Sequence, residues 1–81
     1  MKLYDEPIEV VMANESWPMR VCWRGNWYDV AKIQDTWKVR GRHWYKEEER
    51  WYYQLLTQDG VIMEVCWSSL KEAWTLVRMV D

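Results

Sequence analysis

Alternating apolar and polar side chains predict a β-hairpin around Gly25 and Asn26. The alternation runs through residues 19–24 before this pair and through residues 27–30 after it. Glycine and asparagine tolerate the positive φ angles that two-residue hairpin turns require, so they fit the loop. A Gly-Asn loop gives three facing pairs, which are Arg24 with Trp27, Trp23 with Tyr28, and Val21 with Val30. Because facing residues share a sheet face, one face is apolar (Val21, Trp23, Tyr28, Val30) and the other is mostly polar (Arg20, Cys22, Arg24, Trp27, Asp29).

A second hairpin is predicted around Asp59 and Gly60, where the length of the loop decides which residues face each other. A two-residue Asp-Gly loop would mix polar and apolar side chains on both faces. A three-residue loop with Gly60 in the left-handed conformation collects the apolar residues on one face, so we predict the longer loop. Its facing pairs are Leu55 with Met63, Tyr53 with Val65, Trp51 with Trp67, and Gln54 with Glu64. Its apolar face is Trp51, Tyr53, Leu55, Val61, Met63, Val65 and Trp67.

The segments outside the hairpins are less regular. Residues 8–13 and 74–80 alternate well enough to predict a first and a last strand, and residues 14–18 predict a turn. Between the hairpins, the apolar residues Ile33 and Trp37 are four positions apart, a helical spacing that allows one short helical turn near 33–38. Residues 38–49 then read as a loop that is basic at first and acidic at its end.

Together these elements predict a mainly β fold in a single small domain over residues 1–81, with an ordered core over about 7–80. About six antiparallel strands follow one another as a meander. Such a meander forms a strongly bent sheet or a small barrel.

Composition explains how so short a chain can build a core. The 81 residues include eight Trp and five Tyr but no Phe. Each aromatic side chain can bury roughly 150–250 Å², so a few of them fill a small core without disulfide bonds. We therefore predict that four tryptophans are core residues: Trp23, Trp51, Trp67 and Trp74.

Charge is uneven along the chain, although the net value is only −2. Residues 20–46 contain seven Lys and Arg side chains against two acidic ones. Trp44 and Tyr45 lie among these cations. Such a mixture is typical of sites where nucleic-acid bases stack on aromatic rings and phosphates are neutralised. A solvated loop anchored by one inserted Trp would give the same pattern. Trp27 is predicted to face away from the core beside Arg24, where a surface cation–π contact would also explain it. The candidate interaction surface is Arg24, Trp27, Lys38, Arg40, Arg42, Trp44, Tyr45 and Lys46.

The sequence offers little to catalysis. A nucleophilic Cys–His pair would have to combine Cys22 or Cys66 with the single histidine, His43, yet the predicted registers turn both cysteines away from the apolar faces. The spacing of these three residues matches no compact zinc motif. The acidic run at residues 47–49 is typical of a solvated surface, and the three glycines stand apart from one another. We therefore predict no enzyme activity, no metal site and no cofactor.

The N-terminal residues suggest a compartment. Residues 1–9 are charged and lack the apolar region of a signal peptide. The sequence also lacks an apolar run of about 18 residues, the length that a transmembrane helix needs. We expect a cytoplasmic protein without a membrane partner, in which Cys22 and Cys66 are free thiols.

Several short motifs together resemble an uncharacterised bacterial domain family, over about residues 7–81. They are Trp23-Arg24-Gly25-x-x-Tyr28-x-Val30, Trp44-Tyr45, Glu49-Arg50-Trp51-Tyr52-Tyr53, Asp59-Gly60 and Trp74-x-Leu76-x-Arg78. Many relatives have two adjacent tryptophans in place of Trp44-Tyr45 and an acidic residue in place of Trp51. Members occur as short stand-alone proteins, and similar segments end some ImuB-type homologues of Y-family DNA polymerases. Those homologues are regarded as non-catalytic adaptors in mutagenic DNA repair, so the resemblance implies an accessory module.

Two functional hypotheses follow. The first is a non-enzymatic interaction module, linked to DNA damage tolerance, that contacts single-stranded nucleic acid through the candidate surface. The alternative is a protein-binding or self-associating β domain without a nucleic-acid role, because Trp, Tyr, Met and Arg are also enriched at protein interfaces. In that case an unpaired edge strand, such as residues 8–13, would accept a strand of the partner.

Overall fold

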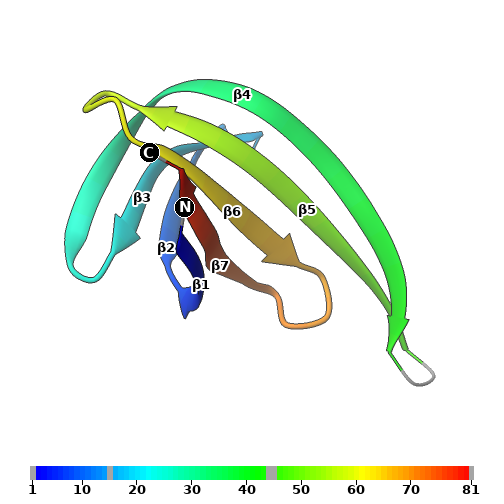
Figure 1. Ribbon diagram of the computed structural model, residues 1–81. Helices are drawn as coiled ribbons and strands as arrows, with labels where there is room; N and C mark the ends of the chain where they lie inside the picture. Colours follow the sequence, from blue (N-terminus) through cyan, green and yellow to red (C-terminus); the bar gives the residue numbers. More distant parts are fainter. Residues whose placement is uncertain (1, 15, 44–45, 81) are drawn as a thin grey trace.

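The protein folds into one antiparallel β-sheet in the computed structural model, which describes residues 2–14, 16–43 and 46–80 (Figure 1). Its strands are β1 (Lys2–Pro7), β2 (Glu9–Ala13), β3 (Trp17–Trp23), β4 (Asn26–His43), β5 (Lys46–Thr57), β6 (Ile62–Ser68) and β7 (Ala73–Val80). The predicted mainly β fold class is confirmed. The described residues include no helix long and apolar enough to cross a membrane.

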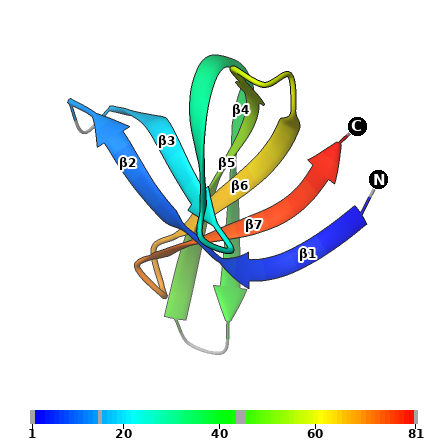
Figure 2. The same cartoon turned by 90° about the vertical axis from the view of Figure 1, so that its left-hand side faces the viewer.

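The sheet is curled into a half-barrel, as Figure 2 shows. Its strand order is β1-β7-β6-β5-β4-β3-β2, so β2 to β7 form a meander and β1 adds to β7. The consecutive strands β1 and β2 are therefore the two opposite edges of the sheet. The chain passes from one edge to the other at Ile8, whose backbone N–H donates to the carbonyl of Trp74 on β7 at 3.2 Å. The predicted meander and bent sheet are both confirmed.

The core lies on the inner face of the curled sheet. Its six buried side chains come from β3 to β7 and are Val21, Val30, Leu55, Met63, Val65 and Leu76. Half-buried side chains pack around them, among them Trp23, Tyr28 and Ile33. The two apolar faces predicted from the hairpins thus meet in one core.

The sequence pattern does not predict β1, because its acids Asp5 and Glu6 hide the alternation. This strand nevertheless pairs with β7, and Tyr4 packs against the core. The ordered structure therefore begins earlier than residue 7. The turn predicted over 14–18 is also shorter than expected, since β3 already begins at Trp17.

The first hairpin has a different turn from the predicted one. The loop is Arg24-Gly25, with φ angles of 53° and 79°, and Trp23 faces Asn26. The predicted pairing of Arg24 with Trp27 is therefore wrong, since Cys22 faces Trp27. Sliding one strand by two residues keeps every side chain on its side of the sheet, so the predicted faces are still correct.

The second hairpin is confirmed in its register. Leu55 faces Met63, Tyr53 faces Val65, Trp51 faces Trp67 and Gln54 faces Glu64. Gly60 adopts a φ of 85°, the left-handed conformation that the three-residue loop requires. The buried carboxylate of Glu64 accepts hydrogen bonds from Gln54, at 3.2 Å, and from Arg78 on β7.

The predicted helical turn near 33–38 is wrong, because these residues belong to the 18-residue strand β4. The register of β4 against β5 shifts between Ile33 and Asp35. A bulge of this kind inserts one residue and reverses the alternation. Ile33 therefore faces the core residue Leu55, whereas Trp37 faces Tyr52 on the outer face. The four-residue spacing of Ile33 and Trp37, which suggested a helical turn, thus belongs to a strand interrupted by a bulge.

The predicted loop over 38–49 is also wrong, because its described residues are strand. Residues 36–43 of β4 pair with residues 46–53 of β5, and we call this two-stranded unit the arm. The far end of the arm extends past β6 and β7 (Figure 1). Trp44 and Tyr45 lie outside the described residues.

Candidate functional site

The inner face of the sheet contains an open groove of about 750 Å³. It is lined by one methionine and four aromatic side chains, Met12, Trp51, Tyr53, Trp67 and Trp74, and we call it the aromatic groove. Four strands contribute, with Met12 from β2 and the rings from β5, β6 and β7. Met12 precedes the four aromatic residues by 39 to 62 positions in the sequence, and the curl of the sheet brings them to one site.

The strand register places three tryptophans in one row. Trp51 faces Trp67 on β6, and Trp67 in turn faces Trp74 on β7. The ring centroids of Trp67 and Trp74 are 5.7 Å apart at an interplanar angle of 47°, and those of Tyr53 and Trp74 are 5.6 Å apart at 43°. Tilted rings at this separation pack favourably. The floor of the groove is therefore a continuous aromatic surface held by strand pairing.

The tryptophans of the groove are not the closed core that their sequence context predicts. Trp67 and Trp74 are only half-buried, and Trp51 is 38% exposed. Trp74 still packs against the core, as predicted, but Trp51 and Trp67 do not, because the alternation identifies the inner face and cannot show how far the core covers it. Trp23 also remains half-buried, with its indole N–H donating to Glu6 at 3.2 Å.

A cationic side chain lies at the rim of the aromatic groove. The ammonium of Lys38 is 4.7 Å from the ring centroid of Trp51, a cation–π distance. The same ammonium is 3.1 Å from Glu49, and Arg40 is 3.4 Å from the other oxygen of that carboxylate. The hydrogen bond from Lys38 lowers the pKa of Glu49, and Arg40 adds to the effect. Lys38 therefore lies beside the groove through Trp51, whereas Arg40 is linked to it only through Glu49.

The predicted candidate surface is divided between the two ends of β4 (Figure 1). Arg24 and Trp27 belong to the hairpin at the start of the strand, whereas Lys38, Arg40 and Arg42 follow one another along the arm. Lys46 is exposed at the start of β5. The six candidate residues that the structure describes thus do not form one patch.

At the start of β4, the cations are held by acids of neighbouring strands. Arg24 forms two hydrogen bonds with Glu6 of β1, at 3.0 and 2.5 Å, and its guanidinium lies 4.5 Å from the centroid of Trp23. These bonds lower the pKa of Glu6, with Arg24 as the main cause. Trp27 is covered by Arg20, at 4.7 Å, and Arg20 also bonds to Asp29. The role predicted for Arg24 beside Trp27 thus belongs to Arg20.

Along the arm, the basic residues of β4 face the acidic residues of β5. Arg40 faces Glu49 and Arg42 faces Glu47, with an ion pair of 3.8 Å in the second case. Residues 35–50 hold five Lys and Arg side chains against four Asp and Glu. The strongly basic segment predicted from the sequence therefore becomes a nearly neutral surface once its strands pair.

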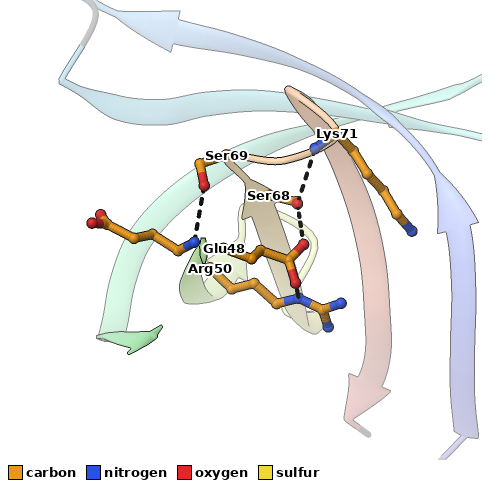
Figure 3. Close-up of polar contacts among 6 residues, drawn as sticks. Glu48, Arg50, Ser68, Ser69 and Lys71 are labelled. Carbon is orange, nitrogen blue, oxygen red and sulfur yellow. Dashed lines mark hydrogen bonds and ion pairs between the residues drawn. The ribbon is translucent and has the colours of Figure 1, made fainter. Parts of the chain in front are cut away.

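A polar cluster ties the arm to the turn between β6 and β7 (Figure 3). The Glu48 carboxylate accepts hydrogen bonds from the Ser68 hydroxyl, at 2.5 Å, and from Arg50, at 3.0 Å. The Ser68 oxygen accepts from the backbone N–H of Lys71, and the Ser69 oxygen accepts from that of Glu49. The Ser68 hydroxyl is the main cause that lowers the pKa of Glu48. We call this cluster the clasp, and it holds the chain beside Trp67 in place.

Reactive groups are few in the described part of the chain. No three His, Cys, Asp or Glu side chains there come together as a metal site. Cys22 and Cys66 are free thiols, as predicted. Burial raises the pKa of Cys66, which disfavours the nucleophilic thiolate.

Sequence reasoning missed the groove although it identified most of the residues involved. The facing positions of Trp51 and Trp67 were available from the predicted register, but nothing local indicates that Trp74 completes the row. Met12 reaches the groove only through the curl of the sheet.

Comparison with known proteins gives a family but no characterised relative. A search of curated proteins found no match, and a search of solved structures found none either. The predicted link to the C-terminal segments of ImuB-type polymerase homologues is not shown by these comparisons. One family model, DUF6504, a domain of unknown function, matches residues 1–81. The chain therefore belongs to the DUF6504 family.

Proposed function

We propose that this chain is a non-enzymatic interaction module that binds an extended segment of a partner protein in the aromatic groove. The single observation that carries the proposal is the groove itself, an open hollow of about 750 Å³ lined by Met12 and four aromatic side chains. Aromatic side chains provide most of the binding free energy at many protein interfaces, because they bury a large area at a small cost in conformational entropy.

The chemistry of the lining favours an apolar segment. The rings present continuous apolar area, and the flexible thioether of Met12 adapts to different occupants. Met12 belongs to β2, an edge strand, so the backbone beside the groove supports an added strand. An extended segment would place alternate side chains against the rings while its backbone pairs with that edge.

A matched pair of tryptophan variants tests this proposal. Peptides selected from a random library on the wild-type protein are titrated by calorimetry against Trp51→Ala and Trp37→Ala. These side chains have similar exposure, 38% and 36%, but Trp51 lines the groove and Trp37 lies on the outer face of the arm. We expect roughly tenfold weaker binding for Trp51→Ala and no change for Trp37→Ala. Equal effects of the two substitutions, or failure to select any peptide, would contradict the proposal.

A second candidate function is the binding of single-stranded nucleic acid, and it is favoured by the position of Lys38 over Trp51. A base stacked on Trp51 would leave its phosphate near Lys38 and Arg40. In this version the module would serve DNA damage tolerance, as the resemblance to ImuB-type segments implies. The glutamates along the arm oppose this candidate because they neutralise the same cations.

The anisotropy of a labelled single-stranded oligonucleotide, measured at low and at moderate salt, tests this candidate. Binding that weakens steeply as salt rises, and that weakens again in Trp51→Ala, would support it. Absence of binding at low salt would exclude it and leave the protein partner.

A further inference from the structure

The edge of β4 that points away from β5 has no partner over most of its length. β3 pairs with β4 only over residues 26–29, at the start of the strand. From Lys32 to His43, the described residues provide no strand on that side. Figure 1 shows this edge along the outside of the arm. Unpaired backbone N–H and C=O groups in such an edge are ready to pair with another chain.

The two faces that border this edge differ in chemistry. On the inner face, Lys38, Arg40 and Arg42 follow one another at alternate positions, and the side chains of Arg40 and Arg42 are 65% and 71% exposed. On the outer face, Trp37 and Val39 are exposed apolar side chains. The ring of Trp37 stacks on that of Tyr52, with the two ring centroids 5.4 Å apart and an interplanar angle of 3°. This stacking holds the Trp37 ring in place.

We propose that the free edge of β4 accepts an extended strand of a partner protein in which acidic and apolar residues alternate. Facing residues of paired strands share a sheet face, so every second side chain of the partner would face the three cations. The remaining side chains would cover Trp37 and Val39. The three cations face only two glutamates on β5, Glu47 and Glu49, so this face keeps a net positive charge that favours acidic side chains, and apolar contact defines the partner on the other face.

A second copy of this chain does not fit the same edge. Residues 32–43 carry four Lys and Arg side chains against one acid, Asp35. Pairing this edge with itself would bring like charges together, which destabilises a sheet. An acidic partner would instead place these cations between the glutamates of β5 and the carboxylates of the added strand.

This proposal goes beyond the function proposed for the aromatic groove, because it concerns a different edge of the sheet. Trp51 lines the groove, whereas Arg42 and Val39 border only the free edge. Variants of these residues therefore separate the two sites, and either proposal can fail without the other.

A pair of synthetic peptides tests the proposal on the full chain. One short acetylated peptide alternates glutamate and valine, and its control alternates lysine and valine. Each is titrated into isotope-labelled protein while backbone amide signals are followed by NMR. We expect the glutamate peptide alone to shift the amides of residues 36–42 and to protect them from exchange, with an affinity that falls as salt rises.

Charge reversal at Arg42 provides the decisive variant. Its ion pair with Glu47 is long and both side chains are largely exposed, so we expect Arg42→Glu to destabilise the arm only slightly. We expect Arg42→Glu to weaken binding of the glutamate peptide roughly tenfold and Arg42→Lys to preserve it. Equal binding of both peptides, unchanged affinity in Arg42→Glu, or shifts confined to the aromatic groove would overturn the proposal. Self-association of the protein through these amides would overturn it as well.

Discussion

The clasp gives the sharpest test of the structure, through the variant Ser68→Ala. The Ser68 hydroxyl donates to the Glu48 carboxylate at 2.5 Å, and the Glu48 side chain is only 12% exposed. A hydrogen bond to a charged group contributes about 1.5–3 kcal/mol. The same oxygen also accepts from the Lys71 N–H at 3.2 Å, a neutral bond worth about 1 kcal/mol. We therefore expect Ser68→Ala to lower the free energy of unfolding by about 2.5–4 kcal/mol at neutral pH.

This loss should depend on pH in a defined direction. Hydrogen bonds from Ser68 and Arg50 hold the pKa of Glu48 below its usual value of 4.5 in the folded protein. A carboxyl group with a depressed folded pKa stabilises the protein above its unfolded pKa, and that contribution is lost as the pH falls through the folded pKa. The difference between wild type and Ser68→Ala is therefore largest near neutral pH and shrinks below about pH 4.5.

Urea unfolding followed by tryptophan fluorescence, between about pH 7 and about pH 3, measures this difference. Ser69→Ala is the matched control, because its oxygen accepts only from the neutral backbone N–H of Glu49 among the contacts of the clasp. We expect a smaller loss for the control that does not change with pH. If Ser68→Ala cost the same free energy at both ends of the range, the assigned role of Glu48 would be refuted.

Three further substitutions test the core, a turn and an ion pair. Leu55→Ala removes a fully buried side chain and should cost about 2–5 kcal/mol in urea unfolding, whereas Val39→Ala on the exposed arm should change stability little. Gly60→Ala places a side chain at a φ of 85° and should cost about 1 kcal/mol, whereas Gly41→Ala, without a positive φ and with open space for its Cβ, should cost nothing. Arg24→Ala should raise the pKa of Glu6 toward its usual value in an NMR titration, and an unchanged pKa would contradict the assigned contact.

The parts of the fold that sequence reasoning predicts are those that local alternation determines. The second hairpin is correct to the residue because only one loop length collects its apolar side chains on one face. The first hairpin is shifted because Arg24, rather than Asn26, takes the positive φ. The compensating contacts come from Glu6, which lies 18 residues away in the sequence. Such a distant partner leaves no trace in the alternation around the turn.

The charge of the candidate site also depends on contacts between segments that the local sequence does not show. The summed charge of residues 20–46 predicts a basic surface. The pairing of β4 with β5, however, brings Glu47 beside Arg42 and Glu49 beside Arg40. The sequence places those acids after the cations, whereas the hairpin places them opposite. Charge along a chain thus predicts a surface only when the strand pairing is known.

Unequal strand lengths explain why both proposed surfaces involve the same part of the molecule. β4 has 18 residues and β5 has 12, but their outer neighbours β3 and β6 have seven each. The far ends of β4 and β5 therefore pair with each other alone, which leaves both faces of the arm and the edge of β4 uncovered. A two-stranded unit is only marginally stable by itself, and the cross-strand ion pairs of Arg40 and Arg42 together with the clasp compensate for the missing neighbours. The charges that looked like a nucleic-acid site thus have a structural reason to be present, and the two proposed binding surfaces are the parts of the arm that its short neighbours leave uncovered.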